Sequence, residues 1–422
     1  MIKTKNIRLI CIYIYAFFII YSPNILKTIG IESYYILALL AIIQLLFYFL
    51  KRGKIIKLIT NDGFIFICSI FVLSIYYMAI ALINGTALNE LDRLRIIQNN
   101  MPIICLINVA FLVRYLKNLN YNIDDMLKFL FNVIFIQSLI CILMVIIPQF
   151  RNIALFLYGN DNIFITSVRI YGISNDYTYA TPIFHGMITS ILTIYSFLNN
   201  KKKYYIYIPF FIITIFLNGR TGLIVYVITT LICLLIIGIK QKKMYKFFKI
   251  LLIGTICFII FINISKILIP SSYSFVKSLV NDTINFLFLG ELTGNYASLF
   301  DSFLFFPKGI NLLIGHSTQV IGTAGYKYNI YKSSDIGYVN DIFLGGISYA
   351  FSLYIIYYIF IKKKLTKNNK NYFTYNLFTK IIILSLIIAN YKGEIFRSIT
   401  MITGVILIKM IFSNETECKK NE

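Results

Sequence analysis

Residues 31–50 read IESYYILALLAIIQLLFYFL, and the seven residues that follow, KRGKIIK, contain four positive charges. A run of about twenty apolar residues is the length that crosses about 30 Å of hydrocarbon as an α-helix. Similar blocks recur along the chain, and they are too long and too unalternating to be strands of a membrane barrel. The sequence therefore predicts an all-α polytopic membrane protein.

The composition supports this fold class. Of the 422 residues, 59% are hydrophobic and 14% are charged, against roughly 25% charged residues in soluble proteins. The net charge is +23, but no run of Lys or Arg exceeds three residues, and the basic clusters lie in short connections between apolar blocks. We therefore expect contact with membrane lipid and no nucleic-acid partner. With two histidines and no C-x-x-C pair, we also expect no metal site and no cofactor.

Apolar windows predict about twelve transmembrane helices in one integral membrane domain, residues 1–422. The windows are 7–26, 31–50, 63–83, 96–113, 126–147, 178–198, 205–217, 222–239, 249–269, 337–361, 377–390 and 397–412.

Positive charge predicts the orientation. If both termini are cytoplasmic, 27 of the 40 Lys and Arg residues fall in or beside inner segments, as the positive-inside rule requires. Two outer loops result, residues 148–177 and 270–336. The second has apolar residues at helical spacing in 273–287 and another apolar stretch at 299–306, so we expect short amphipathic helices there. A cap packed on the bundle and a lid over a site both fit this pattern.

Arg220 is the best candidate for an anion ligand. It lies in the stretch Asn218-Gly-Arg-Thr-Gly222, which we interpret as a tight outer turn whose glycines free the backbone. A guanidinium can hold a phosphate through two parallel hydrogen bonds. The alternative is an arginine that anchors the helix at the membrane interface.

A second candidate segment leads into the helix predicted at 178–198. Arg169, Gly172, Asn175 and Asp176 occur within eight residues, so a cation, a carboxylate and exposed backbone N–H groups are close together in sequence. An ordinary helix cap by Asn175 or Asp176 explains the same residues. His185, about two turns further along, is either catalytic or a neutral histidine with partners in the bundle.

The remaining candidates follow the large loop. His316 comes after an apolar stretch, and Asp335 and Tyr338 lead into the helix predicted at 337–361. Asp341 is about one turn into that helix, where a carboxylate is a functional candidate, whereas Asp335 is either functional or an N-cap. Arg397 ends the outer turn of the last hairpin, where it either touches substrate or forms a surface ion pair with Glu394.

Between about residues 165 and 360 the chain resembles the Wzy-type O-antigen polymerases and, more distantly, the O-antigen ligases. The features that carry the resemblance are Arg169-x-x-Gly172 with Asn175, the Asn-Gly-Arg220-Thr-Gly222 turn, the late outer loop ending in Pro307-Lys-Gly-Ile-Asn-Leu-Leu-Ile-Gly315-His316, and Asp335-x-Gly337-Tyr338 followed by Gly345-Gly346.

The resemblance implies a glycosyltransferase at the periplasmic face of the bacterial inner membrane. It would join a glycan donor and acceptor, both linked to undecaprenyl diphosphate, and a chain-length regulator protein would be a further partner. Such a reaction needs cations on the departing diphosphate and a base near the acceptor hydroxyl. Arg169 and Arg220 suit the first role, and Asp335, His185 or Asp176 the second.

Two other functions stay open. Ligases of this group usually carry a histidine where this chain has Ser334-Asp335, so its absence favours a polymerase, although His316-Ser317 keeps a ligase in view. A lipid-linked oligosaccharide flippase has a similar size, but it needs polar residues deep in its bundle. Gln98, Asn99 and Asn100 are the main polar cluster of that kind.

Overall fold

The computed structural model describes residues 2–25, 30–52, 59–85, 90–147, 149–153, 170, 172–175, 179–242, 304–322, 330–362 and 372–413, with isolated positions between 245 and 290. All regular secondary structure in these ranges is helical. Eight of the helices are long and apolar enough to cross a membrane. The described part of the chain is therefore all-helical, and the chain is a multi-pass membrane protein, as the composition predicts.

Each predicted window coincides with a helix except 249–269, which lies outside the described residues. The helices are α1 Ile2–Tyr21, α2 Ser33–Arg52, α3 Asn61–Ile83, α4 Glu90–Lys117, α5 Ile123–Ile146, α8 Ala180–Leu198, α9 Tyr207–Asn218, α10 Arg220–Lys240, α14 Asn311–Ile314, α15 Gly337–Ile361, α16 Tyr372–Asn390 and α17 Ile399–Ser413, with short 3-10 helices η2 Lys202–Ile206 and η5 Ile395–Arg397.

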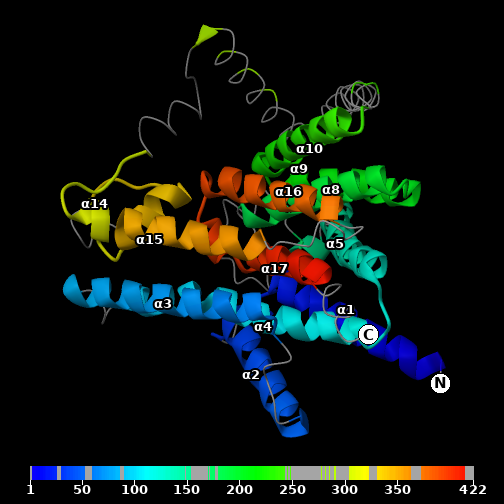
Figure 1. The fold of residues 1–422 in the computed structure, drawn as a ribbon, viewed down its shortest axis with the longest axis horizontal. Helices are drawn as coiled ribbons and strands as arrows, with labels where there is room; N and C mark the ends of the chain where they lie inside the picture. The colour runs from blue at the N-terminus through cyan, green and yellow to red at the C-terminus, as the bar shows by residue number, and fades with distance from the viewer. Residues whose placement is uncertain are drawn as a thin grey trace.

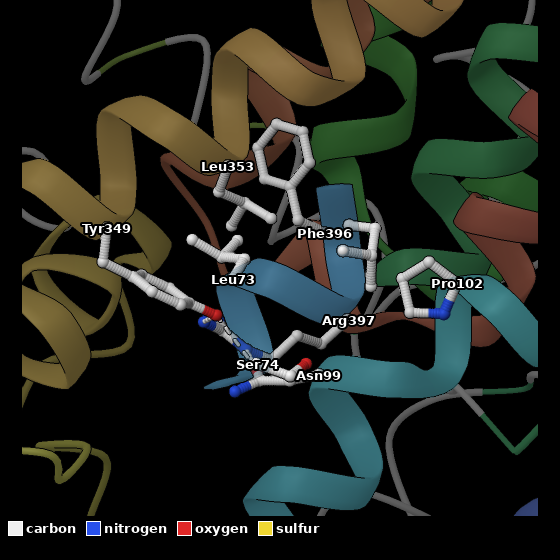
Figure 2. A pocket seen from close by; sticks show the side chains of 9 residues that line it. Leu73, Ser74, Asn99, Pro102, Tyr349, Leu353, Phe396 and Arg397 are labelled. Atoms are coloured by element: carbon white, nitrogen blue, oxygen red, sulfur yellow. Dashed lines mark hydrogen bonds between the residues drawn. The ribbon is translucent and has the colours of Figure 1, made fainter. Parts of the chain in front are cut away.

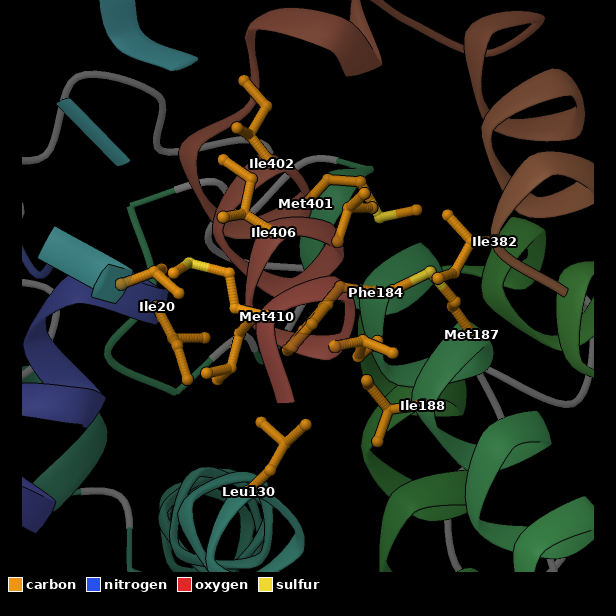
Figure 3. Close-up of a cluster of buried hydrophobic side chains, with 14 of the residues drawn as sticks. Ile20, Leu130, Phe184, Met187, Ile188, Ile382, Met401, Ile402, Ile406 and Met410 are labelled. Carbon is orange, nitrogen blue, oxygen red and sulfur yellow. The ribbon is translucent and has the colours of Figure 1, made fainter. Parts of the chain in front are cut away.

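The core is built around two helices that are buried on every side. All side chains from Ala180 to Ser196 of α8 and from Ile399 to Phe412 of α17 are buried. Figure 3 shows α17 among apolar side chains that include Ile20, Leu130 and Phe184. Outer helices such as α2 instead leave large apolar side chains exposed, which suits contact with lipid. A helix whose faces are mostly apolar is expected in such a core.

The helix ends meet in two groups. At one end of the bundle, Lys409 of α17 lies 3.7 Å from Asp62 of α3, and Lys201 forms a 3.0 Å ion pair with Asp124 of α5. The opposite ends of α4, α15, α16 and α17 meet in a separate charged cluster. In Figure 1, α3, α15, α16 and α17 run along the long axis of the molecule between these two ends. The first group contains ends predicted to be cytoplasmic, and the second contains ends predicted to be outer.

Helix α15 is interrupted at Gly345 and Gly346, whose backbone angles are not helical. The end of the large loop is docked at this break: the His316 N–H donates to the Phe343 carbonyl (2.7 Å), and a Cβ on Gly346 would collide with the Leu313 carbonyl. Tyr77 of α3 also donates to the Ser317 carbonyl (3.0 Å). The described end of the loop therefore packs on the bundle, while residues 273–287 and most of 299–306 lie outside the described residues.

Candidate functional site

The charged cluster at the predicted outer ends is centred on Asp341 and Arg397. Asp341 lies one turn into α15, and Arg397 ends η5 in the turn before α17; the guanidinium Nη1 is 2.7 Å from Asp341 Oδ1. The second carboxylate oxygen accepts from Tyr354 (2.6 Å) and from Asn390 of α16 (3.1 Å). Neither member of the pair has more than 5% of its side chain exposed. The pair thus joins three helices through a fully hydrogen-bonded buried carboxylate.

A second ion pair extends the cluster to α4. Arg95 Nη1 lies 2.6 Å from Glu394 Oε2, and Glu394 Oε1 lies 3.5 Å from Arg397 Nη1. Burial alone would raise the pKa of the Glu394 carboxyl, but the charges of Arg95 and Arg397 outweigh it and hold this pKa below its usual value of 4.5. The interpretation of Glu394 and Arg397 as a surface ion pair is therefore wrong, because both side chains are buried.

Asn99 links the cluster to a small cavity. Arg397 Nε donates to Asn99 Oδ1 (3.0 Å), and so does the Tyr349 hydroxyl (3.1 Å). Figure 2 shows these side chains beside Ser74 and Pro102, around a cavity of about 10 Å³. A cavity needs about this much space to hold a single water molecule. The cavity in this conformation therefore has no room for a sugar or a phosphate.

The segments that carry Arg169 and Arg220 come together elsewhere at the predicted outer ends. The Ile170 N–H donates to the Leu217 carbonyl at the end of α9, with an N–O distance of 3.2 Å. Arg169 directly precedes Ile170 in the chain, and Arg220 begins α10 three residues after Leu217. Arg169 itself, Asp176 and the side chain of Arg220 lie outside the described residues.

The local interpretation of the Asn218–Gly222 turn needs correction. Gly219 has a φ of 178°, which is extended backbone open to any residue, and Gly222 lies inside α10. A Cβ on Gly222 would collide with the Pro182 carbonyl of α8. The glycine is therefore required by the close approach of α8 and α10 and does not serve to free the turn.

Two cap interpretations are also wrong. Helix α8 begins after Tyr179 and α15 begins after Ile336, and neither of these two N-cap residues makes a side-chain cap. Asn175 instead accepts from Asn24 (2.6 Å) and donates to Ser33 (3.2 Å), so it ties the segment before α8 to the turn between α1 and α2. The side chain of Asp335 is exposed and does not cap α15.

The candidate bases and ligands differ in their surroundings. His185 is completely buried among aromatic rings and its Nε2 is 2.9 Å from the Tyr21 hydroxyl. His316 stacks on Phe343, and partial burial lowers the pKa of its imidazole. Tyr338 donates to the Ile387 carbonyl of α16 (2.8 Å). Of the candidates described, Asp335 is the one with an exposed carboxylate, and the structure brings Asp341 and Arg397 together.

The sequence interpretation did not identify several members of the cluster: Arg95, Tyr349 and Tyr354. One signal was available, because Arg95 and Asn99 are four residues apart and lie on one face of a helix. Among the described residues, no three His, Cys, Asp or Glu side chains gather where they could hold a metal ion. Comparison with family models, curated proteins and solved structures finds no match for this chain.

Proposed function

We propose that the chain is a glycosyltransferase of the O-antigen polymerase type, which joins lipid-diphosphate-linked repeat units at the outer face of the inner membrane. The observation that supports this proposal is the Ile170–Leu217 hydrogen bond, because it brings the segments of Arg169 and Arg220 to one place. Two arginines there would neutralise a diphosphate without a metal ion.

In the proposed reaction, a hydroxyl oxygen of the acceptor glycan attacks the anomeric carbon of the donor glycan. The bond from that carbon to the diphosphate oxygen breaks, the diphosphate leaves with the electron pair, and the hydroxyl proton passes to a base. Negative charge grows on the leaving group as the sugar becomes oxocarbenium-like, so cations placed there stabilise the transition state. Asp335 is the candidate base whose carboxylate is exposed in the structure.

The experiment complements a polymerase-deficient strain with variants and reads glycan length on a gel. We expect Arg220→Ala to reduce polymer by roughly a hundredfold or more, since removing a transition-state donor typically costs that much. Arg220→Lys should also lose activity, because it keeps the charge but not the bidentate geometry. Lys308→Ala is the matched control, since Lys308 is an exposed cation on the same predicted face. Full-length glycan from a normally expressed Arg220→Ala protein would refute the proposal.

A lipid-linked oligosaccharide flippase is the second candidate, and the break in α15 beside buried charges favours it. Deleting the gene for this chain separates the two functions. If the chain is a polymerase, single repeat units should still reach the cell surface in the deletion strain, and if it is the flippase, none should. Absence of surface units in the deletion strain would favour the flippase.

A further inference from the structure

Asn218, the last residue of α9, has a buried side-chain amide that makes no hydrogen bond to any described residue. Its side chain is 1% exposed, and within the described part of the chain neither Nδ2 nor Oδ1 has a partner. Burying an amide without partners is costly, so such groups are rare in folded proteins and call for an explanation. Thr214, one turn earlier on the same helix, shows the usual situation, because its hydroxyl donates to the Phe210 carbonyl (2.9 Å).

The location of Asn218 suggests what it is for. It directly follows Leu217, whose carbonyl binds Ile170, and it directly precedes Gly219 and Arg220. Gly219 and Thr221 are partly exposed, so the turn reaches the surface. The first backbone N–H groups of α10 have no acceptor within the helix. In the chain, Asn218 thus comes directly after the residue that binds Ile170 and two residues before Arg220.

The hydrogen-bonding groups of the Asn218 amide limit which ligands could satisfy it. A phosphate only accepts hydrogen bonds, so it would satisfy Nδ2 but leave Oδ1 without a donor. Sugar hydroxyl and acetamido groups both donate and accept. The sugar attached to the diphosphate carries such groups within a few ångströms of the phosphate.

We propose that Asn218 binds this first sugar of the lipid-linked substrate, with Nδ2 donating to the sugar and Oδ1 accepting from it. The inference rests on the proposed function and adds a residue that determines specificity for the glycan. The amide of Asn218 then forms its hydrogen bonds when the substrate binds. A glycan that cannot form them would leave the buried amide unpaired, and this free-energy cost would discriminate against that glycan.

The test is the variant Asn218→Leu, which has a similar volume and no polar atoms. Removing an unsatisfied buried group should leave the melting temperature unchanged or raise it. We expect polymer formation to fall at least tenfold, because a site built to hydrogen-bond its substrate loses both contacts. Higher stability with lower activity is a combination that a purely structural asparagine would not give.

Ligand-induced thermal shifts in detergent separate the sugar from the diphosphate. The probes are undecaprenyl diphosphate and the lipid-linked repeat unit extracted from a polymerase-deficient strain. Asn218→Leu should keep the shift caused by undecaprenyl diphosphate and lose the additional shift caused by the sugar. Arg220→Ala should lose the diphosphate shift.

Thr214→Val is the control, since it removes a hydroxyl that already has a partner on the same helix. It should lower the melting temperature slightly and leave the additional sugar shift intact. If Asn218→Leu retains the sugar shift and full polymer length, or unfolds at a clearly lower temperature, the inference is wrong. If the native protein shows no shift with either probe, the proposed function itself fails.

Discussion

The pairing of Asp341 with Arg397 makes a quantitative prediction about stability. Arg397→Met removes a guanidinium whose Nη1 lies 2.7 Å from Asp341 Oδ1, with 5% and 0% of the two side chains exposed. Breaking a buried pair from one side typically costs 3–5 kcal/mol, because the other charge stays buried without compensation. We expect Arg397→Met to lower the free energy of unfolding by about 3 kcal/mol, the lower end of this range, because Tyr354 and Asn390 still donate to Asp341.

A double-mutant cycle isolates the interaction between the two charges. Asp341→Asn removes the partner charge with little change of shape, and in the double variant neither charge is left facing an empty position. The double variant should therefore lose about 1 to 3 kcal/mol less than the sum of the single variants. The Arg95–Glu394 pair persists in all of these proteins, so it does not contribute to the difference.

Unfolding by sodium dodecyl sulfate in mixed micelles, followed by circular dichroism, measures these free energies. Lys362→Met is the control, because Lys362 is an exposed cation bonded to the Tyr358 hydroxyl, and it should change stability by less than about 0.5 kcal/mol. A loss below about 1 kcal/mol for Arg397→Met, or strictly additive effects in the cycle, would show that the pair does not hold the helix ends together.

Three further predictions address the glycine break, the carboxylate and the orientation. Gly346→Ala should destabilise the protein by more than Gly85→Ala in the same unfolding assay: both glycines have positive φ, of 74° and 67°, but a Cβ at Gly346 also collides with backbone while Gly85 has open space. Because the pKa of Glu394 is lower in the folded protein than its usual value, its stabilising contribution is complete above about pH 4.5 and declines as pH falls below it. Glu394→Gln should weaken this acid sensitivity when unfolding at pH 7 and pH 4 is compared. Alkaline phosphatase fused near residue 300 should be active, and a silent fusion would reverse the predicted orientation.

The helices could be predicted from the sequence because membrane spans need long apolar runs, and that signal is local. Boundaries were harder to predict where charge enters a helix. Helix α4 begins at Glu90, whereas its predicted window begins at residue 96, directly after Arg95, a charged residue that is buried through its bond to Glu394, far away in the chain. No local sequence pattern around Arg95 contains Glu394. The predicted window therefore leaves the charge of Arg95 outside the helix.

The candidate site shows the same limit. Asp341 and Arg397 were recognisable singly, as a carboxylate within a span and an arginine at an outer turn, but their pairing depends on how the fold brings α15 and η5 together. Gly222 was assigned to the turn because glycine often marks one, whereas its reason is the neighbouring Pro182 carbonyl on another helix. When the role of a residue depends on a partner that is distant in sequence, that role can be recognised only once the fold is known.

The break in α15 bears on the choice between enzyme and transporter. Asp341 lies before the break and Tyr354 after it, yet their side chains are 2.6 Å apart, so one hydrogen bond spans the interruption. The Phe343 carbonyl freed by the break is bound by the His316 N–H of the outer loop. Broken helices in transporters line the substrate path, and one part of the bundle rocks against the other around the site. Here the two halves are joined by side chains and supported by the loop, which is the arrangement a rigid site needs to keep reacting groups in place. The presence of the break fits a flippase, whereas the hydrogen bonds that hold the break in place fit the proposed polymerase better.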